Sequence, residues 1–215
     1  FSGVGVALVT PFDETGRVDE HSLRNLVNYV IDGGVDYLVA LGTTSEAATM
    51  TAEERAFVVR VIAEENAGRL PIVLGIGGNN TEQVIHDLAT LPYLQFGDAI
   101  LSVTPYYNKP SQQGLYNHFK AIAEHTPLPV ILYNVPGRTS VNMTAAITLK
   151  LARDFENIIA IKEASGNFDQ ATAIISGMPK NFIFLSGDDG IALPLASIGA
   201  SGVISVIANV MPSEF

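Results

Sequence analysis

Lys162 differs from the other four lysines of the chain because it directly follows an apolar, strand-like run, Ile158–Ile161. Alternation along a strand places Ala160 and Lys162 on one face and Glu163 on the other. If the first face is buried, burial disfavours the ammonium form, lowers the lysine pKa and frees the amine for imine formation. The alternative is a lysine paired with a carboxylate at the strand end, such as Asp188 or Glu163.

Hydroxyl side chains follow neighbouring predicted strands. Tyr133 ends the strand before that of Lys162, and a phenol beside an imine can move protons if other hydroxyls relay them. Thr43, Thr44 and Tyr107 stand at the ends of the second and fourth predicted strands, as such a relay requires. Taken singly, each of these hydroxyls is also typical of a residue that caps a loop.

Arg138 lies four residues beyond the end of the fifth predicted strand, in a loop opened by Pro136 and Gly137. A planar, permanently charged guanidinium in such a loop suits a carboxylate ligand. An ordinary surface ion pair is the alternative. The three sets of residues together indicate a site for carbonyl chemistry on an anionic substrate.

These residues need a scaffold of alternating strands and helices. Short apolar runs bounded by turn residues predict strands at Val4–Val9, Tyr37–Leu41, Ile72–Ile76, Ala99–Val103, Val130–Tyr133, Ile158–Ile161, Phe182–Leu185 and Val203–Ile207. Helical patterns lie between them at Glu20–Ile31, Ala52–Glu65, Thr81–Leu91, Gln113–His125, Ala145–Arg153, Asp169–Ser176 and Ile191–Ile198. Thr51 with Glu54 predicts a capping box, and Asp19 and Thr81 are expected N-caps.

Eight such units without a linker predict one α/β domain over residues 1–215, a (β/α)8 barrel. The active site of such a barrel lies at the carboxyl ends of the strands. Only Asn209–Phe215 follows the eighth predicted strand. We therefore expect a barrel that lacks its eighth helix, in a chain that is incomplete at its C-terminus.

Composition excludes several classes of protein. The net charge of −10 argues against a nucleic-acid partner, which demands a basic surface. No apolar stretch is long enough to cross a membrane, and the absence of cysteine suits a reducing cytoplasm. The four histidines fall on predicted helices without ligand spacing, so no metal is expected. The glycine-rich segment Gly75–Asn80 lacks the third glycine of a dinucleotide fingerprint and is interpreted as a tight turn.

The motifs at the strand ends resemble those of the 4-hydroxy-tetrahydrodipicolinate synthase family, also called dihydrodipicolinate synthase. The resemblance runs from Gly3 to the last residue, with Ser45 where the family usually has glycine. It implies that the C-terminal helical segment of the family is absent here, in agreement with the missing eighth helix. It rests on four segments: Gly42–Glu46, Thr104–Pro110, Tyr133–Thr139 and Ile161–Ala164.

The resemblance implies a cytoplasmic enzyme of lysine and diaminopimelate biosynthesis that condenses pyruvate with L-aspartate 4-semialdehyde and needs no cofactor. Lys162 would carry pyruvate as a Schiff base, and Tyr133 would donate and accept protons with Thr43 or Thr44 and Tyr107. Thr44 and the backbone of Ile204 would bind pyruvate, and Arg138 the carboxylate of the semialdehyde. In this family the equivalent of Tyr107 comes from a neighbouring subunit, which implies a homodimer or, more usually, a homotetramer.

Two alternatives remain open at this point. N-acetylneuraminate lyase and the 2-keto-3-deoxy sugar acid aldolases share the lysine and the tyrosine but use another aldehyde, which does not need the carboxylate-binding Arg138. A non-catalytic ligand-binding barrel would need a broken set of lysine, tyrosine and threonine. All three residue types are present, which argues against the non-catalytic barrel, and Arg138 favours the synthase over the aldolases.

Overall fold

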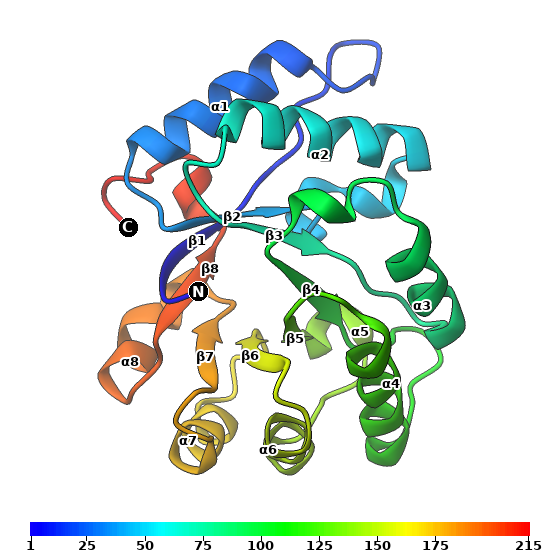
Figure 1. Cartoon of the computed structure of the whole chain (residues 1–215). Coiled ribbons are helices and arrows are strands. Elements are labelled where there is room, and N and C mark those ends of the chain that lie inside the picture. The colour runs from blue at the N-terminus through cyan, green and yellow to red at the C-terminus, as the bar shows by residue number, and fades with distance from the viewer.

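Eight parallel strands form a closed barrel in which each strand pairs with its neighbours in chain order, and β8 pairs with β1. The computed structural model describes residues 1–215. The strands are β1 (Gly3–Ala7), β2 (Tyr37–Ala40), β3 (Ile72–Gly75), β4 (Ala99–Val103), β5 (Val130–Asn134), β6 (Ile158–Glu163), β7 (Ile183–Ser186) and β8 (Gly202–Ser205). The helices surround this barrel (Figure 1), so the (β/α)8 prediction is confirmed.

The helices alternate with the strands as predicted, except that the short helix α5 precedes α6 between β5 and β6. They are α1 (Glu20–Asp32), α2 (Ala52–Asn66), α3 (Thr81–Thr90), α4 (Gln112–His125), α5 (Pro136–Thr139), α6 (Ala145–Asp154), α7 (Phe168–Gly177) and α8 (Ala192–Ser197). Short 3-10 turns are η1 (Thr43–Ser45), η2 (Ala47–Thr49), η3 (Leu94–Phe96), η4 (Asp189–Ile191) and η5 (Ile207–Asn209). Because α8 lies between β7 and β8, only η5 follows β8. The segment after it runs beside α1, where the Tyr29 hydroxyl donates to Val210 O at 2.6 Å.

Local capping explains where the helices begin. Thr51 and Glu54 form the expected capping box of α2, and the Asp19 side chain accepts from Ser22 N at the start of α1. The prediction that Thr81 caps α3 was wrong. The Asn80 side chain is the cap, since an asparagine amide reaches the N–H three residues on from an extended backbone.

Two apolar layers hold the barrel together. Side chains that point outward from the strands pack under the helices in a cluster of 37 buried residues. Side chains that point inward form a second cluster of 12 buried residues. Tyr37 fills part of the interior beside Gly5, where a Cβ would approach the tyrosine ring to within 2.1 Å. The barrel is therefore a filled core with its chemistry confined to its end.

One irregularity interrupts the pairing of β5 with β6. Val130 pairs with Ile158, but Ile131 pairs with Ala160, so Ile159 is an extra residue in β6. Beyond this bulge the side chains alternate regularly. Ala160 belongs to the inner cluster and Ile161 to the outer one.

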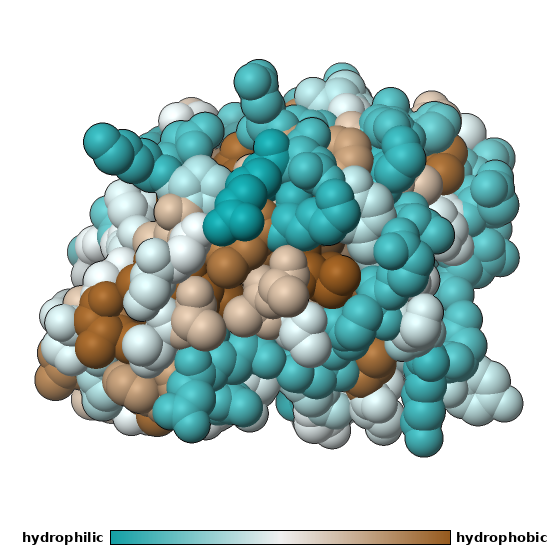
Figure 2. Space-filling view, turned by 90° about the horizontal axis from the view of Figure 1, so that it is seen from below, coloured by the Kyte–Doolittle hydropathy of each residue, from teal (hydrophilic) through white to brown (hydrophobic).

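The face of the protein seen in Figure 2 is mainly hydrophilic, with apolar residues in patches between the polar ones. None of the helices is both long enough and apolar enough to cross a membrane.

Candidate active site

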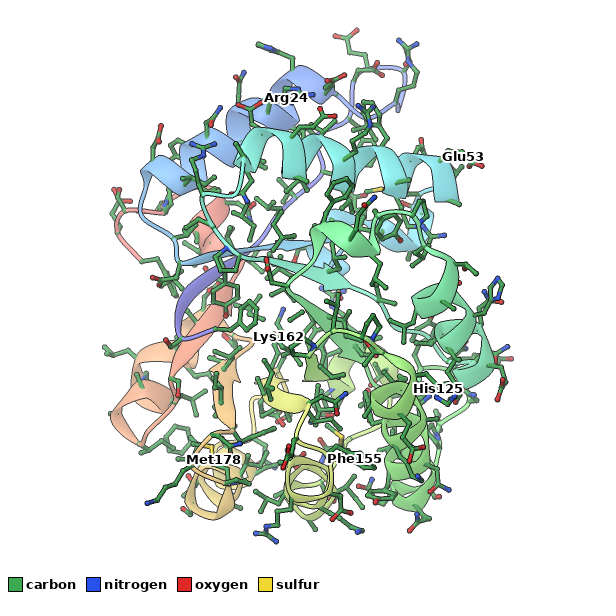
Figure 3. The ribbon with its side chains drawn as sticks, in the orientation of Figure 1. Arg24, Glu53, His125, Phe155, Lys162 and Met178 are labelled. Atoms are coloured by element: carbon green, nitrogen blue, oxygen red, sulfur yellow. The ribbon has the colours of Figure 1, made fainter.

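Lys162 and Tyr133 lie side by side at the carboxyl ends of β6 and β5. They are register partners in the sheet, and Lys162 Nζ lies 4.5 Å from the centre of the tyrosine ring. Both side chains are buried, with 5% and 6% of their surfaces exposed. Figure 3 shows Lys162 among the strands in the middle of the molecule, whereas Arg24 and Glu53 lie on the outer helices. The predicted inward orientation of Lys162 is confirmed.

Burial prepares the amine of Lys162 for nucleophilic attack. Removal of the ammonium from water lowers the pKa of Lys162 from its ordinary 10.5 to about 8, and the positive charge of Arg138 acts in the same direction. The carboxylate of Asp189 opposes both effects. A lysine with a pKa of about 8 is partly a free amine near neutral pH, which imine formation requires.

The phenol of Tyr133 is held in its neutral form. Burial raises its pKa, while the nearby hydroxyl of Thr43 and the charge of Arg138 lower it in part. Thr43 and Thr44 belong to η1, the turn that follows β2. The two residues before this turn, Leu41 and Gly42, lie over Gly75, where a Cβ would be only 2.0 Å from Leu41 O. The structure thus brings Thr43 to Tyr133, as the sequence predicts.

A cavity of about 300 Å³ opens beside this group. Tyr133, Thr43 and Arg138 line it together with Leu101 and Val103 of β4 and with Val135, which follows β5. Arg138 lies in α5, a one-turn helix where a loop is predicted; Pro136 at its first position favours this turn because its ring fixes φ near the helical value. Arg138 forms no ion pair with another residue of the chain. Its guanidinium is therefore free to bind an anion in the cavity.

Four of the predicted site residues do not line this cavity. Lys162 lies against the ring of Tyr133, and Thr44 follows Thr43 in η1. Tyr107 follows β4 with a left-handed backbone (φ 72°), and 88% of its surface is exposed. It does not line the cavity, so one chain alone does not bring it to Tyr133. Ile204 is buried in β8 with its side chain in the inner cluster, which leaves its backbone as the part that could contact a substrate.

The carboxylate whose charge acts on Lys162 is neither Asp188 nor Glu163, the two that the sequence suggests. Asp188 accepts from Gly190 N, and Glu163 is surrounded by amide donors on the outer face of the barrel. The neighbouring Asp189 is the carboxylate whose charge acts on Lys162, and its Oδ2 accepts from Val206 N and Ile207 N, each at 3.0 Å. Sequence spacing does not single out Asp189, because either member of the Asp188–Asp189 pair could face inward.

Arg55 is a second cation on the cavity wall that the motifs do not indicate. It lies in the first turns of α2, four residues after the cap Thr51, where a cation on an exposed helix face is the usual interpretation. No group of three or more His, Asp or Glu side chains is arranged to hold a metal ion.

Comparisons with known proteins agree on one family. The model of the dihydrodipicolinate synthetase family matches residues 1–215. The 4-hydroxy-tetrahydrodipicolinate synthase of Flavobacterium psychrophilum is 57% identical over 215 residues, which are 100% of this chain and 73% of that protein. The protein of the same name from Bacillus subtilis is 46% identical over the same shares of both chains.

Solved structures give the same result. A crystal structure of dihydrodipicolinate synthase from Bacillus anthracis superposes with a TM-score of 0.94 at 44% identity and covers 100% of this chain and 73% of that one. A monomeric dihydrodipicolinate synthase variant superposes with a TM-score of 0.95 at 40% identity and covers 100% and 72%.

Proposed function

The chain belongs to the dihydrodipicolinate synthetase family, and we propose that Lys162 is the amine that carries pyruvate in its reaction. The chain is a Schiff-base lyase that condenses pyruvate with L-aspartate 4-semialdehyde to 4-hydroxy-tetrahydrodipicolinate in lysine and diaminopimelate biosynthesis. The observation that carries the assignment of Lys162 is its buried amine, 4.5 Å from the ring centre of Tyr133 in the barrel mouth.

The reaction begins at the keto carbon of pyruvate. The free amine of Lys162 attacks this carbon, and loss of water gives an imine. Removal of a proton from the methyl carbon gives an enamine, which attacks the aldehyde carbon of the semialdehyde. The new alkoxide takes up a proton, and the amino group of the product then displaces Lys162 from the imine carbon. This last step restores the free amine.

Tyr133 moves protons in these steps, with Thr43 as its partner. The position of both side chains on the wall of one cavity and the burial of the phenol support this role. Thr44, next to Thr43 in η1, and the backbone of Ile204 bind the pyruvate carboxylate. Arg138 binds the carboxylate of the semialdehyde, because it is an unpaired cation on the wall of the cavity.

A homo-oligomer completes the relay. Tyr107 is 88% exposed and lies outside the cavity of its own chain, so a second copy of the chain would supply the phenol that the relay needs. We therefore propose at least a dimer, and a dimer of dimers as the working form. We also propose that the enzyme works in the cytoplasm, where its substrate pyruvate is produced.

A substrate comparison tests the assignment. The protein is incubated with pyruvate and either L-aspartate 4-semialdehyde or a polyhydroxylated aldehyde such as N-acetylmannosamine, and pyruvate consumption is followed. We expect turnover only with the semialdehyde, since Arg138 has no partner on an uncharged aldehyde. Preferential turnover of the sugar aldehyde would contradict the role of Arg138 and favour a sugar-acid aldolase.

A further inference from the structure

A network of polar side chains lies directly behind the lysine–tyrosine pair, on the outer face of β5 and β6. At its centre is Glu163, which is only 3% exposed. We propose that Glu163 is a positioning residue that holds Lys162 against Tyr133 and ties the segment bearing Arg138 to the same two strands. The proposal rests on the function assigned above and adds a residue outside the substrate cavity.

The carboxylate of Glu163 is held entirely by N–H donors. Ser165 N donates to Oε1 at 2.7 Å, Asn134 Nδ2 donates to Oε2 at 3.0 Å, and Gln170 Nε2 donates to Oε2 at 2.9 Å. None of the ion pairs of the chain includes Glu163. A buried carboxylate without a cation is retained only where its hydrogen bonds are complete, so these donors define where Glu163 can lie.

Asn134 and Glu163 are also register partners, one residue further along β5 and β6 than Tyr133 and Lys162. Tyr133 pairs with Lys162 and Asn134 pairs with Glu163. Because successive side chains of a strand point to opposite faces, the first pair faces the barrel mouth and the second faces the helices. The contact between Asn134 and Glu163 therefore fixes, from behind, how the two strand ends that carry Lys162 and Tyr133 lie relative to each other.

The same network extends to the segment that follows Arg138. Asn134 Oδ1 accepts from Met143 N at 2.9 Å, and Asn134 Nδ2 donates to Asn142 Oδ1 at 2.8 Å. Asn142 Nδ2 in turn donates to Gln170 Oε1 at 2.8 Å. Residues 142 and 143 lie three and four positions beyond the end of α5, which bears Arg138. The network thus joins β5, β6, α7 and this segment.

The network needs a carboxylate at position 163. An ionised carboxylate accepts hydrogen bonds at both oxygens, whereas a glutamine accepts at one and donates from its NH2 group. In Glu163→Gln one of the three donors faces another donor, and the strand end must shift to relieve the conflict. Catalysis is sensitive to such shifts, since a displacement of about 1 Å can cost roughly 10²-fold in rate.

Three variants test the proposal in the full-length protein. Glu163→Gln removes the double acceptor, Gln170→Leu removes one donor on α7 without a change in β6, and Glu156→Gln is the control on the exposed surface. Borohydride trapping of pyruvate counts the active sites of each variant, and kcat is expressed per trapped site. A loss of folded protein lowers the number of trapped sites, but it leaves kcat per trapped site unchanged.

We expect kcat per trapped site to fall roughly 10- to 100-fold in Glu163→Gln and by a smaller factor in Gln170→Leu, with no change in Glu156→Gln. The KM for pyruvate should change less than kcat. A wild-type kcat per trapped site in Glu163→Gln overturns the proposal. If that variant does not fold, a wild-type value in Gln170→Leu overturns it instead. Failure to trap pyruvate on Lys162 of the wild type would contradict the proposed function, a result separate from either outcome.

Discussion

Tyr133 and Lys162 are paired across β5 and β6, and the lysine Nζ lies 4.5 Å from the centre of the phenol ring. The amine therefore lies over the ring face, and Tyr133, but not Lys162, lines the cavity. In the proposed reaction the two side chains have separate tasks, since Lys162 binds pyruvate covalently and Tyr133 moves its protons.

Pyruvate with borohydride should label Lys162 and no other lysine. Lys162 is the buried lysine of the chain and its pKa is lowered to about 8, so its amine is the most available for an imine that borohydride can reduce. Peptide mass mapping locates the adduct. Lys162→Ala should lose the label, and labelling at Lys109 would contradict the assignment.

Tyr133→Phe should slow turnover by about 10²-fold or more, the usual contribution of a general acid or base. The phenylalanine keeps the ring beside Lys162 and removes only the hydroxyl. Steady-state kinetics measure the effect, with Tyr29→Phe on the surface of α1 as the control. Equal rates for Tyr133→Phe and the wild type would show that the Tyr133 hydroxyl does not take part in the reaction.

Arg138→Ala should raise the KM for the semialdehyde far more than the KM for pyruvate. The loss of a hydrogen bond to a charged group, about 1.5–3 kcal/mol, corresponds to roughly 10- to 150-fold. Both constants are measured at saturating concentrations of the other substrate. Equal changes in the two constants would indicate that Arg138 only supports the fold of α5.

The kcat/KM for pyruvate should rise with pH and level off above about 8, because the free enzyme reacts through the unprotonated amine of Lys162. Asp189 raises the pKa of this amine, so Asp189→Asn should move the rising limb to lower pH. Asp188→Asn is the matched control and should leave the limb in place. A limb that moves to higher pH in Asp189→Asn would contradict the assigned electrostatics.

Acid should destabilise the protein partly through His118. This side chain of α4 is buried, and burial lowers its pKa from 6.5 to about 4. Between these values the unfolded chain binds a proton that the folded chain does not, so stability falls as the pH drops from about 6.5 to 4. The full effect is about 3 kcal/mol. Urea unfolding across this pH range should show a smaller loss of unfolding free energy per pH unit in His118→Gln than in the wild type. Equal losses in the two proteins would contradict the interpretation.

Sequence periodicity predicts most of this fold because the strands are short apolar runs that end in polar residues. Lys162 could be identified for the same reason, since a charged residue at the end of such a run is conspicuous. The one-turn helix α5 was missed because four residues carry no periodic signal. Thr81 was mistaken for the cap of α3 because Asn80, one residue earlier, is an equally good cap.

The surroundings of Glu163 could not be predicted, since they depend on residues far apart in the sequence. Its donors come from β5, α7 and its own strand end, and only the closed barrel brings these elements together. The sequence indicates no more than an acidic residue on the outer face. The role of Tyr107 likewise depends on an arrangement outside a single chain, and it stays a prediction.

The bulge in β6 lets this strand hold one more residue than its partner without turning Lys162 away from the barrel mouth. Val130 and Ile158 both point outward, and strict alternation from Ile158 onward would turn Lys162 toward the helices. The bulge at Ile159 absorbs the extra residue, so Ala160 points inward opposite Ile131 and Lys162 still pairs with Tyr133. Removal of Ile159 would leave an unbroken ladder with the same pairs from Ala160 onward. The orientation of Lys162 therefore depends on its pairing with β5 beyond the bulge, and β6 can gain or lose one residue before that point without changing it.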